Sequence, residues 1–181
     1  YTVNDVNGGV STATVTVNVV TALTGGGVAA GSGDTIDISG AGAYQAAYLD
    51  GRGGGDNLTD GNGWSVLVGG AGADSLSGTG GNALLRGGAN RDTVDGGAGI
   101  DLLDFSDASG GITLTLVQSS GNTSVNLSSG GLGLGSDDYR NMEGVIGSAT
   151  GDDSLTGSVL NDVLVGLGGA DTLRGGNGND T

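Results

Sequence analysis

Aspartates recur at a fixed spacing in two stretches of the chain, and their carboxylates are the side chains best placed to do chemistry. A nine-residue period runs from Gly51 to Asp104, and a second begins at Ser148. The sixth positions of the units read Asp56, Ser65, Asp74, Ala83, Asp92 and Asp101, and then Asp153, Asp162, Asp171 and Asp180. A single Asp in a turn needs no metal, because its side chain can hydrogen-bond the nearby backbone. Asp at one slot in so many units instead indicates oxygen ligands for a hard cation, which for Asp and backbone carbonyls is Ca²⁺.

Composition excludes most other chemistries. The 181 residues include no His and no Cys, which excludes a Ser-His or Cys-His nucleophile, a thiolate metal site and a disulfide. With 20 acidic and 5 basic residues the net charge is -15, so the chain repels phosphate backbones and we expect no nucleic-acid partner. The paired carboxylates face each other in the predicted metal turns and no candidate general acid stands apart from them. We therefore predict that the chain is not an enzyme.

A large apolar residue follows each of these slots by two positions and defines the elements that carry the carboxylates. These apolar residues are Leu58, Leu67, Leu76, Leu85, Val94 and Leu103, and then Leu155, Leu164 and Leu173. Positions seven to nine should form short strands with the apolar side chain on one face, and the glycine-rich residues before them should form turns. Two units make one coil, so alternate units stack in the same parallel sheet. The sequence predicts an all-β fold, a parallel β-roll with metal-binding turns.

Stacking alternate units sorts the aspartates onto two edges of the roll. One edge should carry Asp56, Asp74 and Asp92, and the other Ser65, Ala83 and Asp101. In the second stretch, Asp153 should pair with Asp171, and Asp162 with Asp180. Two carboxylates are missing from the second edge of the first stretch, where Asp60 could contribute from a different position.

The units GGAGADSLS, GGAGIDLLD and GGNGND resemble the RTX family of calcium-binding nonapeptide proteins, whose pattern is G-G-x-G-x-D-x-U-x with U large and apolar. The resemblance implies that Ca²⁺ is held between stacked turns by the Asp side chains together with backbone carbonyls, and it implies several ions, about four. The carbonyl donors implied are Gly51, Gly53, Gly69, Gly70, Ala71, Gly72, Gly87, Ala89, Gly166, Gly168 and Gly175.

The remaining segments divide the chain further. Residues 1–20 alternate Val with polar residues after Asn7-Gly8 and resemble the last hairpin of an Ig-like or cadherin-like repeat. Residues 21–33 form a Gly/Ala/Ser linker, 34–104 the first β-roll array, 105–147 a bridging β segment, and 148–181 an incomplete second array. In the bridging segment, ITLTLV and TSVNL are expected to be strands that cover or join the arrays.

These observations and the resemblance predict a calcium-binding structural or adhesive segment of a large secreted bacterial surface protein, which folds on binding Ca²⁺ outside the cell. The alternative is a non-catalytic C-terminal folding and export module of a secreted protease, lipase or polysaccharide epimerase. A carbohydrate- or ice-binding face ranks lower, because the outward positions mix polar and apolar residues. The partners expected besides Ca²⁺ are neighbouring Ig-like repeats, a cell-surface polysaccharide, or further copies stacked end to end, with Tyr1 beside Leu173 of the preceding unit.

Overall fold

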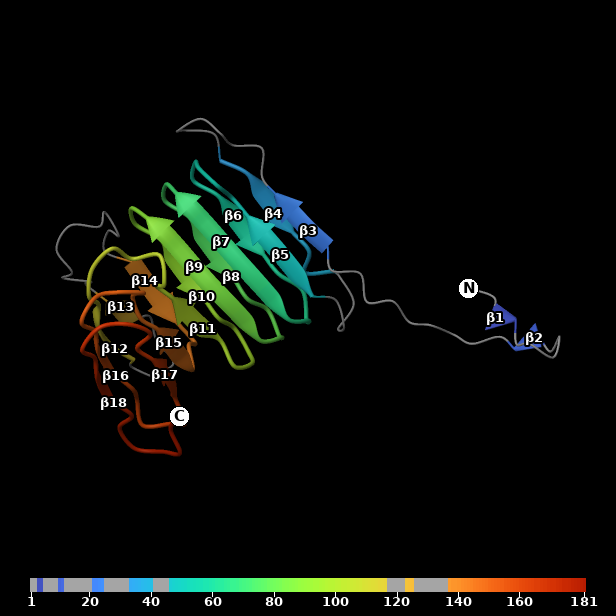
Figure 1. Ribbon diagram of the computed structural model, residues 1–181. Helices are drawn as coiled ribbons and strands as arrows, with labels where there is room; N and C mark the ends of the chain where they lie inside the picture. The colour runs from blue at the N-terminus through green and yellow to red at the C-terminus, as the bar shows by residue number, and fades with distance from the viewer. Residues whose placement is uncertain are drawn as a thin grey trace.

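The computed structural model describes residues 33–40, 46–116 and 137–181, and also the backbone of the short strands at 3–4, 10–11, 21–24 and 123–125. Within these residues every regular element is a strand, and no helix there could cross a membrane. The strands form a parallel β-roll whose layers follow one another along a single axis (Figure 1). The predicted fold class is therefore confirmed.

Two long sheets make up the walls of the roll. The seven-stranded sheet contains β3 (Thr21–Thr24), β5 (Ala47–Asp50), β7 (Ser65–Ala71), β9 (Ala83–Ala89), β11 (Leu102–Asp104), β15 (Gly144–Ile146) and β17 (Val163–Val165), all parallel. The six-stranded sheet contains β4 (Thr35–Asp37), β6 (Asn57–Thr59), β8 (Ser75–Ser77), β10 (Thr93–Asp95), β14 (Asp137–Arg140) and the antiparallel edge strand β13 (Thr123–Val125). A third, parallel sheet contains β12 (Thr113–Thr115), β16 (Ser154–Thr156) and β18 (Thr172–Arg174).

The register confirms that two nonapeptides form one coil. Leu58 lies opposite Leu76, and Leu76 lies opposite Val94, so partners are 18 residues apart. On the facing sheet, Leu67 pairs in the same way with Leu85. Since side chains alternate along a strand, this register turns every eighth-position residue toward the interior.

The interior is a narrow column of aliphatic side chains. Leu49, Leu58, Leu67, Leu85 and Val94 are completely buried, and they belong to one hydrophobic cluster that runs on into the second array. The cluster ends at the last coil, where Leu173 is 46% exposed. Each coil thus adds only a few core side chains, and no coil could bury them without its neighbours.

Four strands of the seven-stranded sheet are longer than the expected three residues: β3 and β5 have four, and β7 and β9 have seven. β7 and β9 are seven residues long and continue through the glycines of the following turn, where Gly70 lies opposite Gly88 and Ala71 opposite Ala89. Glycine permits this extended pairing because it has no Cβ to separate the two backbones.

The two arrays share one sheet. β11, the last strand of the first array, pairs with β15, whose residues come 42 positions later in the chain. β15 in turn pairs with β17 of the second array. The opposite wall is interrupted instead, because β12 and β13 lie in different sheets. Both predicted bridging strands are present, each three residues long.

Several expectations for the N-terminal part lie outside the described residues. These include the strand predicted over residues 14–19 and the position of Tyr1. Two short strands, β1 (Val3–Asn4) and β2 (Val10–Ser11), do pair antiparallel on either side of Asn7-Gly8. This arrangement agrees with the hairpin predicted there.

The narrow core gives a first prediction. Replacing Leu76 with Ala should lower the free energy of unfolding by about 2–5 kcal/mol, because the leucine is buried between two coils that cannot close over the cavity. Urea unfolding of the calcium-loaded chain, followed by circular dichroism, measures this. Ser75→Ala on the exposed face of the same strand is the control and should change the midpoint little. Equal midpoint shifts for both variants would contradict the inward register.

Candidate metal-binding turns

The aspartates of the first array form a hydrogen-bonded ladder along one edge of the roll. The backbone N–H of Asp56 donates to Oδ1 of Asp74 at 2.8 Å, and that of Asp74 donates to Oδ1 of Asp92 at 2.9 Å. The ladder extends at both ends, where Asp34 donates to Asp56 and Asp92 donates to Asp137. Each carboxylate is therefore held by one oxygen between its own coil and the coil before it.

The second oxygen of these carboxylates has no partner. Oδ2 of Asp56, Asp74 and Asp92 is buried and accepts no hydrogen bond, and the same holds for Oδ2 of Asp60 and Asp101. A buried carboxylate oxygen without a donor is costly, because water has been removed and nothing replaces it. These side chains are thus arranged for a positively charged partner.

The unpartnered oxygens of Asp56, Asp74, Asp92 and Asp101 each lie against a glycine, at the position that a Cβ would otherwise occupy. A Cβ on Gly69 would lie 2.5 Å from Oδ2 of Asp74 and 2.6 Å from the carbonyl oxygen of Gly87, one coil further on. At Gly51 the same space is bordered by Oδ2 of Asp56 and the carbonyl of Gly69. Carboxylate and carbonyl oxygens converging without a donor are the ligand set of Ca²⁺. The residues present therefore fit the cation predicted from the sequence.

Burial and crowding also raise the proton affinity of these groups. Burial, together with the negative charges of Asp137 and Asp74, raises the pKa of Asp92 to about 8, although a hydrogen bond from Asp74 opposes the shift. Burial and the charges of Glu143, Asp60 and Asp95 raise the pKa of Asp101 to about 7, against a hydrogen bond from Ala83. The carboxylates therefore need either protons or a cation to remain together.

The turns hold two carboxylates but not three. Among the residues that the structure describes, no group of three acidic side chains gathers in a way that could hold a metal ion. Any cation would therefore depend on carboxylates from two stacked coils and on backbone carbonyls. This dependence on backbone explains why the turns are rich in glycine.

Seven of the predicted carbonyl donors fall into two groups, and the carbonyls of Gly53, Gly70, Gly72 and Gly168 belong to neither. The carbonyls of Gly69, Gly87, Gly166 and Gly175 border the same open spaces as the carboxylates. By contrast, the carbonyls of Gly51, Ala71 and Ala89 already accept backbone hydrogen bonds, the latter two from Gly54 and Gly72 of the coil before. A carbonyl oxygen has two lone pairs, so these three keep one free for a second partner.

The second array satisfies some of its carboxylates internally. The hydroxyl and backbone N–H of Ser148 both donate to Asp153, at 3.0 and 2.8 Å. Ser158 donates in the same way to Asp162. Asp153 and Asp162 still donate to Asp171 and Asp180 of the following coil, as the predicted pairing requires. The serines stand where regular units carry glycine, so these turns need a cation less than those of the first array.

The edge that carries Ser65, Ala83 and Asp101 keeps more charge than its sixth positions suggest. Asp60, at the first position of its unit, is fully buried, and its Oδ1 accepts the backbone N–H of Thr79 at 2.7 Å. Burial raises the pKa of Asp60, and hydrogen bonds from the backbone N–H and the hydroxyl of Thr79 oppose this rise. Asp60 therefore supplies this edge with a carboxylate from the first position of its unit, where the sixth position carries Ser65.

Two acidic residues of the bridging segment were missed in the sequence. Asp137 accepts the N–H of Asp92 at 2.7 Å, and Glu143 accepts the N–H of Asp101 at 2.9 Å. Each stands two positions before a buried core residue, Tyr139 or Val145. That spacing matches the sixth and eighth positions of a repeat unit, and it was the available signal.

The arginines neutralise aspartates outside the turns. Burial acts to raise the pKa of Asp104, but hydrogen bonds from Ser106 and Arg86 lower it below its usual value.

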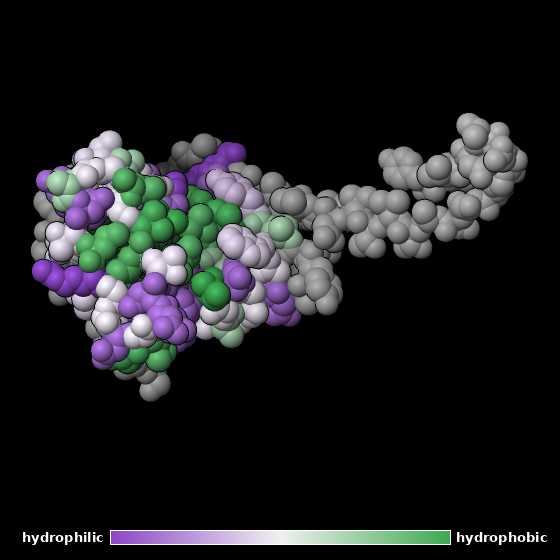
Figure 2. Space-filling model, turned by 60° about the horizontal axis from the view of Figure 1, so that its bottom comes forward, coloured by the Kyte–Doolittle hydropathy of each residue, from purple (hydrophilic) through white to green (hydrophobic). Residues whose placement is uncertain are grey.

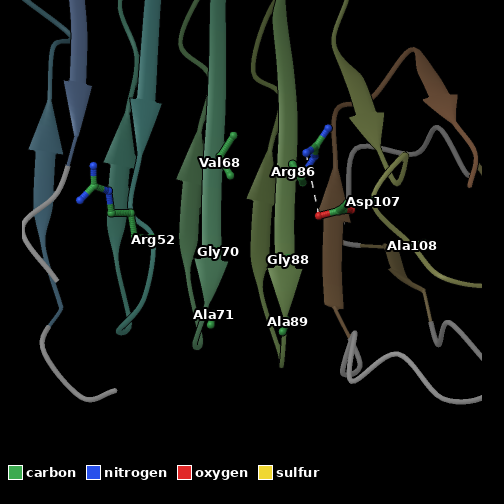
Figure 3. Close-up of a pocket in the computed structure, with 9 residues that line it drawn as sticks. All are labelled: Arg52, Val68, Gly70, Ala71, Arg86, Gly88, Ala89, Asp107 and Ala108. Atoms are coloured by element: carbon green, nitrogen blue, oxygen red, sulfur yellow. Dashed lines mark ion pairs between the residues drawn. The ribbon is translucent and has the colours of Figure 1, made fainter. Parts of the chain in front are cut away.

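Arg86 also borders a groove of about 340 Å³ beside β7 and β9, drawn in Figure 3. The groove is lined by Arg52, Val68, Gly70, Ala71, Arg86, Gly88, Ala89, Asp107 and Ala108. Its acidic residue, Asp107, faces Arg86 at 3.9 Å, and its polar side chains suggest no acid-base pair.

Comparison with known proteins agrees with the geometry of the turns. A family model, the RTX calcium-binding nonapeptide repeat, matches the chain in four copies, over residues 50–85, 68–103 and 149–181. No curated protein matches the chain. The matched residues cover both arrays and leave out the bridging segment that contains Asp137 and Glu143.

The contrast between the arrays gives a second prediction. Asp74→Asn should weaken calcium binding more than Asp153→Asn, because Oδ2 of Asp74 has no hydrogen-bond donor whereas Oδ2 of Asp153 already accepts the backbone N–H of Ser148. Isothermal titration of each variant with CaCl₂ gives the number of ions bound. Equal losses from both variants would contradict the ranking of these turns.

A third prediction concerns the pH dependence of the metal-free chain. The folded-state pKa values of Asp92, about 8, and Asp101, about 7, exceed the ordinary 3.8. The folded state then binds more protons than the unfolded state between these values, so the free energy of unfolding should fall as pH rises through this window. Far-ultraviolet circular dichroism of the chelator-treated chain measures this, and should show more β structure at about pH 5 than at about pH 8. Greater stability at the higher pH, without calcium, would contradict the prediction.

Proposed function

Since this chain carries RTX calcium-binding nonapeptide repeats, we propose that it is a non-catalytic structural segment of a secreted protein, which folds when it binds Ca²⁺ outside the cell. The observation that carries the proposal is the row of unpartnered, buried oxygens of Asp56, Asp74 and Asp92. They lie 18 residues apart on one edge, each against a glycine whose Cβ would collide with the carboxylate oxygen.

The ligands that we propose for Ca²⁺ are the ladder carboxylates with the carbonyls that border the same spaces. In the first array these are Asp56, Asp74, Asp92 and Asp101 with the carbonyls of Gly69 and Gly87. In the second array they are Asp153, Asp162, Asp171 and Asp180 with the carbonyls of Gly166 and Gly175. Bound Ca²⁺ would supply positive charge between stacked carboxylates, where the chain itself offers no cation.

Folding and binding are one process in this proposal. Without Ca²⁺ the stacked carboxylates of a chain with net charge -15 repel one another, and the narrow core cannot compensate. Extracellular calcium modules have dissociation constants of about 0.1–1 mM. At ten times that concentration each site adds about 1.4 kcal/mol, and four sites add about 5–6 kcal/mol, which is comparable to the stability of a small domain. In a low-calcium cytosol the chain would remain unfolded and ready for export.

The parent that we propose is a large bacterial surface protein in which the segment has a structural and adhesive role. The support is the outer face of the seven-stranded sheet, where half-buried Val66, Leu84 and Leu102 lie on neighbouring strands and Val163 follows beyond Gly144 of β15. Figure 2 shows a face of the molecule on which apolar residues gather. Retention of the calcium-loaded chain on bacterial cells or immobilised surface polysaccharide, lost with EDTA, would favour this role.

The alternative is a folding and export module of a secreted enzyme, which the same calcium-driven folding would serve.

The proposal gives a fourth prediction. At neutral pH the far-ultraviolet circular dichroism spectrum of the chain should change from largely disordered to β on addition of millimolar Ca²⁺, and should revert with EDTA. Mg²⁺ at the same concentration is the control, because its octahedral preference and tight hydration disfavour an all-protein site. An identical β spectrum with Ca²⁺ and with EDTA would overturn calcium-dependent folding.

A further inference from the structure

The coil that follows the first array comes from outside the nonapeptide repeats. β11 ends the array, and its neighbour in the sheet is β15 at Gly144–Ile146, with Leu103 opposite Val145. The residues between 104 and 148 are not matched as repeats. The contact between Asp101 and residues 141–144 is therefore the place where the bridging segment joins the ladder.

This junction repeats the hydrogen bonds of the regular turns. The N–H of Asp101 donates to Oε2 of Glu143 at 2.9 Å, as each ladder aspartate donates to the carboxylate of the next coil. In return, the N–H groups of Glu143 and Gly144 donate to the Asp101 carbonyl at 2.9 and 3.1 Å. Asp101 is fully buried, and its Oδ2 has no partner. Glu143 is half-buried beside it.

The open space of the regular turns is also present. A Cβ on Gly96 would lie 2.9 Å from Oδ2 of Asp101 and would meet the carbonyl oxygen of Asn141. The equivalent space at Gly69 is bordered by Asp74 and the Gly87 carbonyl. A carboxylate oxygen and a carbonyl oxygen from the following coil therefore converge in both places.

Asn141 reproduces the backbone of a repeat glycine. Its φ of 54° is in the left-handed region, where the second glycines of the regular turns also lie, such as Gly97 at 84° and Gly88 at 102°. Asn is among the few residues that adopt this conformation at low cost. The bridging segment thus forms a metal-type turn with a sequence, RNMEGV, that lacks the glycines of the family pattern.

The charges at the junction are not balanced by protein cations. Arg140 lies close by, but it pairs with Asp95 at 2.7 Å, and Asn141 donates to the same carboxylate. Among the ion pairs of the described residues, none involves Asp101 or Glu143. The other contact of this segment differs, because Oδ2 of Asp137 accepts the Tyr139 hydroxyl at 2.6 Å and is satisfied.

We propose that Asp101, Glu143 and the carbonyl of Asn141 form a further Ca²⁺ site, which fastens the bridging segment to the first array. The inference rests on the calcium-binding function proposed above and adds a site whose second carboxylate lies outside the repeats. Calcium at this site would join the two arrays into one folding unit, because β15 connects β11 to β17.

The test is a count of bound ions in the full chain, titrated with CaCl₂ in a calorimeter. Glu143→Gln keeps a hydrogen-bond acceptor for the Asp101 N–H and removes the charge, and should bind one ion fewer than the wild type. The double variant Asp101→Asn/Glu143→Gln should lose no more ions than either single variant, since both residues serve one site. The control is Asp107→Asn, which removes a carboxylate that faces Arg86 away from the turns, and should bind as many ions as wild type.

The outcomes separate this inference from the proposed function. A wild-type chain that binds no Ca²⁺ would overturn both. A wild-type chain that binds Ca²⁺, with the ion count and affinities unchanged in Glu143→Gln, would overturn only the junction site. If Glu143→Gln does not fold, Glu143→Asp decides: it keeps the carboxylate and should keep the ion count with weaker affinity for one ion. Loss of that ion in Asp107→Asn as well would also contradict the assignment.

Discussion

The structure depends on buried carboxylates that lack a partner for one oxygen. Stacking places Asp56, Asp74 and Asp92 in line, and the backbone N–H of each coil satisfies Oδ1 of the next. Oδ2 remains buried without a donor and at close range to other negative charges. No arrangement of this backbone removes the imbalance, because the stacking that buries the leucines also brings the carboxylates together. A cation between the coils would satisfy Oδ2 and reduce the repulsion, and folding would then be linked to metal binding.

The same constraint explains the composition. Glycine occupies the positions whose Cβ would fill the space between carboxylate and carbonyl, as at Gly51 and Gly69. In the second array, Ser148 and Ser158 donate hydrogen bonds to the carboxylates of Asp153 and Asp162. These carboxylates therefore need a cation less than those of the first array. The core is narrow and the chain has few aromatic residues, and under the function proposed above Ca²⁺ bound in the turns would add the stability that such an interior does not supply.

The two walls of the roll acquire different outer surfaces for a geometric reason. Consecutive units belong to opposite sheets, so residues that alternate in character along the chain are separated in space. Asn57, Ser75 and Thr93 face outward from the six-stranded sheet, whereas Val66 and Leu84 face outward from the seven-stranded sheet. Outward positions that alternate between polar and apolar along the sequence thus form one polar surface and one more apolar surface. A carbohydrate- or ice-binding face ranked low in the sequence analysis because of this alternation.

The sequence by itself determined the fold class, the core column and the 18-residue pairing of the aspartates. It could do so because each coil repeats the same local backbone, and the positions of Asp and Leu within a unit fix which way they point. It did not reveal that Asp101 has Glu143 as its neighbour, since that contact depends on how a 42-residue excursion returns to the sheet. It also did not reveal which carboxylates lack a donor. That was decided in three dimensions, because Ser148, Ser158 and Tyr139 reach their aspartates and no donor reaches Oδ2 of Asp74.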